Sequence, residues 1–414
     1  MDKIIKKKYL TIIVSFVVLL TTIICMSAPA FAAEVDGNSD IKVACKGAVV
    51  MDARNGNILY AKNSTRRFYP ASCTKLMTAL VALENCNDLS KTLTVSDAAV
   101  NGIDPESSHI ALQVGEKITM EQALYGLLLA SGNDAAVAIA EGVAGSQKDF
   151  AKLMNKKAQE LGLTGSHFAD PHGLYKPDHY TTPQDLAKIM RACLQNPTFV
   201  KIFTTIKYTI PRTNKSKKRV LWNNHRMVKY KYYHHPAVIG GKSGYVTKSG
   251  FNLVTVGEMN NMDLIIVTMR GITAVDMVKD TRKLLDYYLN NYKSVTIKSD
   301  IRTIDLPGRR DVPVRSDGAT FDVIVPKAAS KSDVKITAAP KKNIRFPVKR
   351  GEQVGTVTAS YGGRTAGTAP LYATRTVYSG LALVLHIGAL VLIGLVIFFI
   401  IAGLVRIHKR KTKH

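Results

Sequence analysis

Cysteine, tryptophan and acidic side chains are scarce in this 414-residue chain, which has five cysteines, one tryptophan, and 31 Asp and Glu against 57 Lys and Arg. Four cysteines lie beyond the first 32 residues: Cys45, Cys73, Cys86 and Cys193. Their wide spacing predicts neither a disulfide framework nor a metal pattern, so we expect small buried side chains whose pairing stays open. His172 and the pair His234-His235 lack companion ligands, and we predict no metal and no cofactor.

A second absence lies near the C-terminus, where no Asp, Glu, Lys or Arg occurs from Thr376 to Val405. About 20 apolar residues cross the hydrocarbon core of a bilayer, so residues 376–405 are predicted to form a transmembrane helix. The basic segment 406–414 that follows is typical of a cytoplasmic flank. This orientation would place the preceding part of the chain outside the cytoplasm.

The N-terminus predicts the same orientation. Lys3 and Lys6–Lys8 precede an apolar run from Tyr9 to Met26, and Ala30-Phe31-Ala32 supplies the small residues of a cleavage site. This order is typical of a secretory signal peptide over residues 1–32, and an uncleaved anchor is the alternative. We therefore expect a single-pass protein of the cell membrane whose body is extracytoplasmic.

The formal net charge of +26 favours anionic partners. For an extracytoplasmic body, the partners that fit are anionic wall polymers and lipid headgroups, besides the membrane itself. The alternative is that the charge only maintains solubility. The basic and aromatic segment 217–233 has the composition of a nucleic-acid surface. The predicted location excludes nucleic acid, and we interpret this segment as a flap or groove wall.

Hydrophobic periodicity divides the body into two parts. Residues 33–290 combine strand patterns at 47–60 and 237–271 with helical patterns, which predicts one α+β domain: an antiparallel sheet with helices packed on it and a helical subdomain. The clearest predicted helices span residues 74–85, 120–129, 147–161 and 274–289. Residues 291–375 alternate apolar and polar side chains between Gly and Pro turns, which predicts a small all-β domain serving as a stalk.

Three short motifs could together supply acyl-transfer chemistry, and the first is Ser72-Cys73-Thr74-Lys75. If Ser72 begins a helix, residues three apart share a face, and the Lys75 amine lies beside the Ser72 hydroxyl. A lysine with a lowered pKa can then act as the base that activates the serine. The same spacing recurs at Ser39/Lys42 and Ser332/Lys335, but neither of these copies opens a predicted helix.

The second motif is Ser131-Gly132-Asn133, which follows an apolar helical run. Its hydroxyl could relay a proton to a leaving amine, and its amide could hold a substrate peptide group. The third motif, Lys242-Ser243-Gly244, lies on a predicted strand. There the lysine would add positive charge, Ser243 would bind a carboxylate, and the glycine would let a substrate backbone lie close. Each motif alone is weak, and their combination is specific.

In this order the motifs resemble those of class A β-lactamases and penicillin-binding proteins. Residues 42–290 are similar to the low-molecular-mass D-alanyl-D-alanine carboxypeptidases. The segments that carry the resemblance are Pro70–Ala79, Ser131–Ala135, Asp170–Leu174, Tyr208–Lys215 and Gly241–Tyr245. The resemblance implies a penicillin-binding/β-lactamase-like fold, peptidoglycan stem peptides as substrate, and β-lactam antibiotics as acylating inhibitors.

The resemblance also implies a role for each matched position. Ser72 would attack the D-Ala-D-Ala carbonyl with Lys75 as its base, and Ser131 and Lys242 would serve proton transfer and electrostatics. The backbone N–H groups of Ser72 and Tyr245 would form the oxyanion hole. The expected catalytic residues are therefore Ser72, Lys75 and Ser131. The expected substrate-binding residues are Asn133, Lys242, Ser243, Gly244 and Tyr245.

The chain departs from the family at three points. Lys-Ser-Gly replaces the commoner Lys-Thr-Gly, and the C-terminus is predicted to be transmembrane rather than amphipathic. Asp170 stands where Asn is usual, which puts a local hydrogen bond of the family in question. A DD-transpeptidase or an endopeptidase would use the same residues, and a non-catalytic penicillin receptor would keep the pocket without turnover. A β-lactamase is disfavoured because no Glu-x-x-Leu-Asn segment precedes Lys242.

Overall fold

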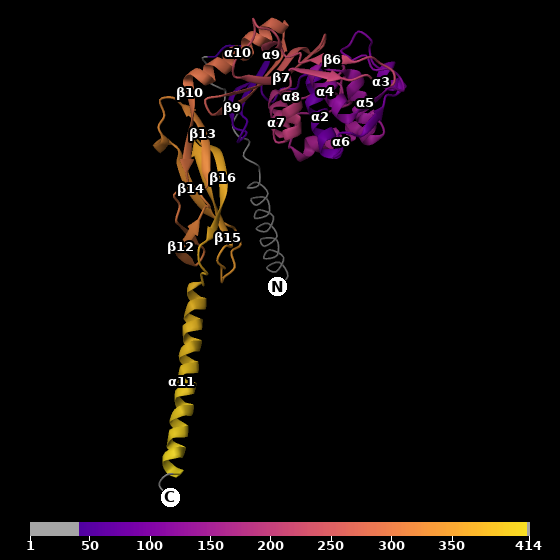
Figure 1. Cartoon of the computed structure of the whole chain (residues 1–414). Helices are drawn as coiled ribbons and strands as arrows, with labels where there is room; N and C mark the ends of the chain where they lie inside the picture. The colour runs from indigo at the N-terminus through magenta and orange to yellow at the C-terminus, as the bar shows by residue number, and fades with distance from the viewer. Residues whose placement is uncertain (1–40, 412–414) are drawn as a thin grey trace, which may run out of the picture.

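A computed structural model describes residues 41–411 of the chain. A mixed helix and sheet domain lies at one end, an elongated β domain follows, and a single long helix continues from the far end of the β domain (Figure 1). The predicted α+β fold with a second all-β domain is confirmed. The predicted signal peptide, residues 1–32, lies outside the described residues.

A five-stranded antiparallel sheet forms the centre of the first domain, in the order β2-β1-β9-β8-β7. Its strands are β1 (Gly47–Asp52), β2 (Ile58–Lys62), β7 (Val238–Val246), β8 (Gly250–Met259) and β9 (Met262–Gly271). Strands β2 and β7 are its two edge strands. Strands β1 and β9, which pair from Gly47↔Met269 to Asp52↔Leu264, thus meet although they are far apart in the sequence, which the strand pattern alone does not specify.

Alternation along these strands produces two hydrophobic cores. In β1, Val49 and Met51 pack among the helices on one face, whereas Ala48 and Val50 pack against α10 (Ala274–Asn291) on the other. Successive side chains of a strand point to opposite faces, so one run of apolar residues serves both cores. The sheet is therefore buried on both sides and provides a rigid support for the edge strand β7.

The helical face is built mainly from sequence inserted between β2 and β7. Its helices are η1 (Ala71–Thr74), α2 (Lys75–Asn85), α3 (Asp97–Val100), α4 (Met120–Leu129), α5 (Asn133–Ala144), α6 (Gln147–Glu160), α7 (Pro183–Leu194), α8 (Pro197–Phe203) and α9 (Arg226–Lys229). Two hairpins accompany them, β3 (Thr92–Thr94) with β4 (Lys117–Thr119), and β5 (Lys207–Ile210) with β6 (Arg219–Trp222).

Several of these helices begin at residues that satisfy their free N–H groups. Thr119 and Gln122 form a capping box at the start of α4, and Thr182 caps α7, which has Pro183 in its first turn. Such caps and an N-terminal proline favour helix initiation at these positions. The predicted helix at 120–129 matches α4, and that at 147–161 ends one residue beyond α6.

The second domain packs two antiparallel sheets around a core of aliphatic side chains. Strands β10 and β13 form one sheet, and the other has the order β11-β12-β16-β15-β14. The strands are β10 (Tyr292–Lys298), β11 (Thr303–Leu306), β12 (Arg309–Arg315), β13 (Thr320–Pro326), β14 (Lys335–Pro340), β15 (Gln353–Tyr361) and β16 (Arg364–Ala373), with a 3₁₀ turn η2 at Lys331–Asp333.

Arg54, in the β1–β2 turn, joins the two domains. Its Nε donates to Asp263 at 2.6 Å within the first domain, and its Nη1 donates to Asp322 of β13 at 3.0 Å. Asn57 Nδ2 donates to the Thr365 carbonyl at 2.8 Å. These partly exposed contacts hold the stalk against the side of the sheet that carries β2.

Helix α11 (Gly380–Lys411) follows β16 after a short connection. Its segment Ile387–Val405 is long and apolar enough to cross a membrane, and none of that segment is buried against the rest of the protein. Figure 1 shows the helix projecting from the end of the β domain opposite the first domain. An unburied apolar helix of this length is a candidate membrane anchor.

Candidate active site

The first motif lies where the chain turns from the extended segment after β2 into α2. Ser72 is in the 3₁₀ turn η1 and Lys75 is the first residue of α2. Ala71, just before the serine, has a φ of 49°, a left-handed conformation that is uncommon for a residue with a Cβ. The local turn therefore presents Ser72 at the surface of a cleft and directs Lys75 into the protein.

Lys75 is fully buried and its amine has three polar neighbours. The Nζ atom lies 2.9 Å from Ser72 Oγ, 2.6 Å from Asn133 Oδ1 and 3.0 Å from the His172 carbonyl oxygen. Three separate chain segments therefore converge on one nitrogen. The structure brings Ser72, Lys75 and Asn133 together as the sequence motifs predict, and adds the His172 carbonyl, which the motifs did not indicate.

Burial and the nearby charge of Lys242 lower the pKa of Lys75 well below its usual value. A neutral amine has two N–H groups and one lone pair. The two N–H groups match the two oxygens that can only accept, at Asn133 and His172. The lone pair is then left for the Ser72 hydroxyl, which is the geometry that a base requires.

Ser131 and Lys242 form a second pair on the opposite side of the site. Lys242 Nζ donates to Ser131 Oγ at 2.8 Å and to the Ser243 carbonyl oxygen at 2.9 Å. Ser131 has a φ of 63° between α4 and α5, a strained conformation that is typical of functional positions. Burial lowers the pKa of Lys242 to about 8, so a proton is available there near neutral pH.

The third motif lines the cleft from the edge strand β7. Ser243, Gly244 and Tyr245 contribute to a cavity of about 750 Å³ that also contains Ser72, Ser131 and Asn133, whereas Lys75 lies behind this lining. Tyr245 is half exposed and stacks on Phe251 at 4.3 Å between ring centroids. An exposed strand edge beside a nucleophile can accept an extended peptide as an added strand.

Gly244 lies where β7 passes close to the turn η1 that carries Ser72. A Cβ at this position would lie 2.8 Å from both the Pro70 oxygen and the Ser72 nitrogen. Real Cβ atoms do not approach backbone so closely, so only glycine allows this packing. The glycine is therefore required by the protein's own chain at η1, whereas the role predicted from the sequence, close approach of a substrate backbone, stays a prediction.

If the cleft carries out the acyl transfer that the motifs predict, Gly244→Ala should lower its kcat/KM by about 100-fold, because a displacement near 1 Å at a reacting centre costs that much. The displaced pair is β7 and η1, so substrate and nucleophile lose their alignment. The check is steady-state hydrolysis together with thermal melting. Gly380→Ala is the control, since a Cβ there has no neighbour within 4 Å. Unchanged hydrolysis in the Gly244 variant would contradict this packing argument.

Asn252 on β8 is an important site residue that the sequence motifs did not identify. Its Nδ2 donates to the carbonyls of Tyr69 and Pro70 at 3.0 and 3.2 Å, and its Oδ1 accepts from the Arg270 N–H. The buried amide therefore attaches the nucleophile turn to the sheet. An asparagine inside a strand pattern has no local signal that distinguishes it from a solvent-facing residue.

The buried Asp170 shapes the turn that supplies the His172 carbonyl. Its Oδ1 accepts the backbone N–H groups of His172 and Gly173 at 3.1 and 2.7 Å. An asparagine oxygen could accept the same two bonds, so the local hydrogen bonding survives this departure from the family pattern. The remaining oxygen, Oδ2, is buried without a hydrogen bond; Lys176 Nζ lies 3.3 Å away and His179 Nδ1 3.7 Å away.

The pKa of Asp170 is held well below its usual range despite burial, which acts to raise it. The close approach of the His179 side chain, the electrostatic effect of His172 and His179, and the hydrogen bond from the Gly173 N–H lower this pKa by more than burial raises it. Asp170 is therefore an ionised carboxylate close behind the Lys75 amine. Its negative charge acts to raise the pKa of Lys75, opposing burial and Lys242.

The loop 104–108 forms the cleft wall beside the second motif. Asn133 Nδ2 donates to Ser107 Oγ at 2.8 Å, and the Asn133 N–H donates to the Ser108 carbonyl at 2.8 Å. This double attachment places Asp104 and Glu106 at the cleft mouth, with Arg226 and Tyr230 among the other lining residues. The basic and aromatic segment 217–233, interpreted from sequence as a groove wall, does contribute residues to the cleft.

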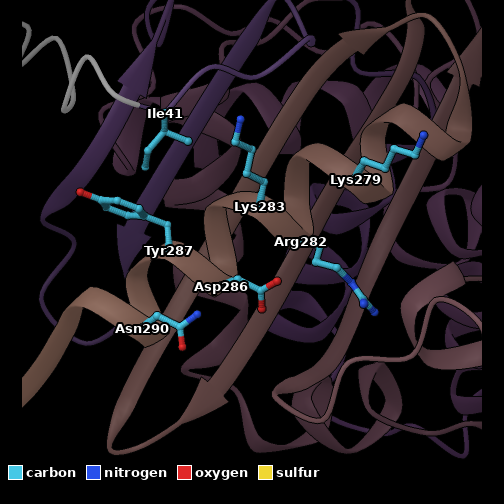
Figure 2. Close-up of a pocket in the computed structure, with 7 residues that line it drawn as sticks. All are labelled: Ile41, Lys279, Arg282, Lys283, Asp286, Tyr287 and Asn290. Carbon is cyan, nitrogen blue, oxygen red and sulfur yellow. The ribbon is translucent and has the colours of Figure 1, made fainter.

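A second surface pocket, of about 480 Å³, lies on the exposed side of α10 (Figure 2). It contains none of the predicted site residues. Its charged side chains bind the backbone of other segments of the same protein. Arg282 donates to the Tyr233 and His234 carbonyls, and Lys283 donates to the Lys42 carbonyl. This pocket is therefore explained by packing of the N-terminal and 226–236 segments on α10.

The four cysteines within the described residues are free. Cys45, Cys73 and Cys193 are buried as expected, whereas the prediction of burial is wrong for Cys86, which is partly exposed. Burial raises the pKa of Cys73 to about 12, so its thiol stays protonated beside the nucleophile. Within the same range, no cluster of three or more potential metal ligands occurs.

Comparison with known proteins identifies the family. A model of the D-alanyl-D-alanine carboxypeptidase family, Peptidase_S11, matches residues 32–273. The chain belongs to this family. A model of the C-terminal domain of penicillin-binding protein 5 matches residues 312–379, which lie in the β domain and the connection to α11. The enzyme is therefore a serine D-alanyl-D-alanine carboxypeptidase that acts through an acyl-enzyme.

Individual relatives cover most of the chain. The D-alanyl-D-alanine carboxypeptidase DacF of Bacillus subtilis is 32% identical over 357 residues, 84% of this chain and 90% of that protein. The crystal structure of penicillin binding protein 5 from Haemophilus influenzae has a TM-score of 0.69 at 28% identity, and covers 83% of this chain and 100% of that one. A DD-transpeptidase of Streptomyces K15 has a TM-score of 0.56 at 29% identity over 60% of this chain.

Proposed function

We propose that Ser72 is the nucleophile of this carboxypeptidase and that Lys75 is its base. The proposal is supported most directly by the three neighbours of the Lys75 amine, because two acceptors occupy its N–H groups and leave the lone pair for Ser72. Ser131, Asn133 and Lys242 complete the site around them. The substrate is a peptidoglycan stem peptide that ends in D-Ala-D-Ala.

In the acylation step, Ser72 Oγ attacks the carbonyl carbon of the penultimate D-alanine and its proton passes to Lys75. The C–N bond to the terminal D-alanine then breaks. Ser131 gives its proton to the leaving amine and is reprotonated by Lys242, whose amine lies 2.8 Å away. The products of this step are free D-alanine and an ester between the shortened peptide and Ser72.

Before deacylation, Lys75 loses the proton it took from Ser72 and Lys242 regains one through solvent, which restores both lysines. Water then attacks the ester carbonyl and gives a proton to Lys75, and Lys75 returns that proton to Ser72 Oγ as it leaves. The backbone N–H groups of Ser72 and Tyr245 stabilise the negative oxygen of both tetrahedral intermediates. Ser243 and the positive charge of Lys242 bind the terminal carboxylate, and Asn133 holds the substrate amide. Gly244 keeps β7 close enough to η1 for these groups to act on one substrate.

The direct test uses the purified full chain and a peptide ending in Lys-D-Ala-D-Ala. One equivalent of D-alanine should be released per peptide. A β-lactam should add its mass to the protein, and a peptide map should place the adduct on the segment that contains Ser72. Adding an acceptor amine tests transfer, because a DD-transpeptidase is among the similar structures. An adduct on another segment, or penicillin binding without turnover, would refute the proposal.

We also propose where the enzyme acts. Residues 1–32 are a signal peptide, α11 anchors the chain in the cell membrane, and the catalytic domain faces the cell wall. The apolar composition of α11 and the basic residues after Val405 support this orientation. The excess of basic residues supports binding to anionic wall polymers, and the enzyme's action on stem peptides gives it a part in wall biogenesis and cell shape.

Asp170→Asn should move the acid limb of the acylation pH profile to lower pH. The amide keeps an acceptor for the His172 and Gly173 N–H groups but removes the charge that acts to raise the pKa of Lys75. Since acylation requires neutral Lys75, a lower pKa keeps the base available in more acidic solution. The measurement is the rate of β-lactam acylation against pH.

Several charges near the Asp170 site stay in place in this variant. Lys242 and Asp134 act on Lys75, while His172, His179 and Lys176 face the altered side chain. Asp170→Ala is the matched comparison, because it removes the acceptor as well and should reduce acylation at every pH. A profile of Asp170→Asn that keeps the wild-type midpoint, or moves to higher pH, would show that the carboxylate does not tune Lys75.

A further inference from the structure

Three segments meet at the end of the β domain from which α11 emerges. Strand β16 runs toward this end, where its residues Tyr372 and Ala373 pair with Arg315 and Val314 of β12. The β11–β12 turn therefore lies beside the connection to α11. The segment 341–352 joins β14 to β15 at the same end, where Val348 and Val377 exchange two backbone hydrogen bonds of 2.9 Å. The end face of the domain is thus formed by residues 307–311, 341–352 and 374–379.

This end face is strongly basic. The three segments together contain eight Lys and Arg but only two acidic residues, Asp311 and Glu352. We call the eight cations the basic collar: Arg309, Arg310, Lys341, Lys342, Arg345, Lys349, Arg350 and Arg375. The rest of the β domain from Tyr292 to Ala373 also has eight cations, but spread over far more residues and accompanied by five acids. The positive charge of the domain is therefore concentrated next to α11.

The side chains of the collar are available for an external partner. Seven are exposed and Arg309 is half exposed. Among the described residues of the β domain, the ion pairs join Asp322 to Arg54 and Asp317 to Arg315, so no cation of the collar takes part in them. Eight cations held close together without acidic partners repel one another, and an anionic surface relieves that repulsion.

We propose that the basic collar binds the headgroups of anionic phospholipids in the leaflet from which α11 emerges. This inference rests on the proposed role of α11 as a membrane anchor. The connection from Val377, hydrogen-bonded within the domain, to Gly380, the first residue of α11, is two residues long. The collar is therefore held within side-chain reach of the bilayer surface whenever α11 spans the membrane.

Lipid binding at the collar would fix the β domain at the membrane. A single helix leaves the attached domain free to tilt about the connection, whereas contacts from three segments around the helix oppose tilting. The β domain is in turn attached to the catalytic domain through Arg54 and Asn57. The collar would thus keep the active-site cleft at a defined height above the membrane, at the layer of wall that the stalk reaches.

Anionic phospholipid selectivity of the full chain in vesicles is the measurement that tests this proposal. Spin-labelled phosphatidylglycerol and phosphatidylcholine report the lipid held at the protein surface. The collar variant replaces one or more cations of each segment: Arg310→Gln, Lys342→Gln, Arg350→Gln and Arg375→Gln. Each cation near an anionic surface contributes about fivefold to binding. We expect the preference for phosphatidylglycerol to fall at least about threefold in the variant, and to weaken with salt in the wild type.

A matched variant removes four exposed lysines of the catalytic domain instead: Lys46→Gln, Lys117→Gln, Lys148→Gln and Lys156→Gln. It should keep the wild-type preference. The basic segment after α11 is present in all three proteins and so cancels in the comparison. A collar variant with wild-type selectivity, or an equal loss in the matched variant, would overturn the proposal. Reduced retention on wall material with unchanged lipid selectivity would assign the collar to a wall polymer and also overturn it.

Two further readouts separate this proposal from those on which it depends. Flotation with vesicles after alkaline extraction tests α11 as an anchor, and failure to float would overturn both ideas. D-alanine release by the same preparation tests the catalytic proposal independently. The collar variant should hydrolyse a soluble peptide at the wild-type rate, because none of its four substitutions lines the cleft.

Discussion

Ser72→Ala should abolish D-alanine release and covalent penicillin labelling while the protein stays folded. Loss of a nucleophile lowers kcat by about 10⁶-fold in a serine hydrolase, and no other hydroxyl lies beside the Lys75 amine to replace it. The removed oxygen is hydrogen-bonded to Lys75 Nζ, so the free energy of unfolding should change by about 1 kcal/mol or less. The measurements are D-alanine release, labelling by a fluorescent penicillin, and thermal melting.

The chain contains its own control for this experiment. Ser332 has a lysine three residues later, as Ser72 does, but it lies in the exposed turn η2 while Lys335 begins β14. Ser332→Ala should therefore leave both activities unchanged. Labelling that survives Ser72→Ala, or that is lost in Ser332→Ala, would mean that the nucleophile has been misassigned.

The contrast between these two serines explains how much of the site could be predicted. Spacing alone does not distinguish the two copies, but a helical pattern follows Ser72 and a strand pattern follows Ser332. Residues three apart share a helical face and lie on opposite faces of a strand. Local periodicity was therefore sufficient to predict the Ser72–Lys75 contact, and likewise the helices at 120–129 and 274–289, which match or lie within α4 and α10.

The rest of the site depends on contacts between distant segments, for which the sequence contains no local signal. Asn252 supports the nucleophile turn from a strand 180 residues later. Asp170 acts through the turn at His172, and its burial against Lys176 and His179 follows only from the packing of the helical face on the sheet. In the same way, the basic collar is spread over three segments of the sequence, and the strand order brings them to one end of the domain.

The two buried lysines also illustrate what the sequence alone could not supply. Both were predicted to be near the nucleophile, but their different roles arise from their surroundings. Lys75 has two carbonyl-type acceptors and a hydroxyl, and burial with the neighbouring charge lowers its pKa well below normal. The pKa of Lys242 falls only to about 8, also through burial. The lowered pKa suits Lys75 to its proposed role as a base, and a pKa of about 8 suits Lys242 to its proposed role as a proton donor.

Lys75→Met should reduce acylation by both peptide and penicillin by about 10²- to 10⁴-fold, the contribution expected of a general base. Methionine fills a similar volume without a lone pair at the end of the side chain. Lys75→Arg tests whether a positive charge alone is sufficient at this position, because a guanidinium stays protonated and cannot act as a base. We expect the arginine variant to be inactive as well. Acylation that survives in it would contradict the role of Lys75 as the base.

The pH dependence of stability provides a second readout for the same substitution. The folded protein holds Lys75 neutral at pH values where the unfolded chain binds a proton there, so this residue makes the folded state less stable at neutral pH. The unfolded state binds more protons in this range, and wild-type stability therefore rises with pH toward the usual lysine pKa. Lys75→Met lacks this dependence.

Between pH 7 and pH 9, the Tm of the wild type should therefore rise relative to the Tm of Lys75→Met. The unpaired oxygens of Asn133 and His172 destabilise the variant by an amount that does not depend on pH, so the slope rather than the offset reports the protonation state of Lys75. A Tm difference that is constant with pH would mean that Lys75 is protonated in the folded enzyme and that another group removes the Ser72 proton.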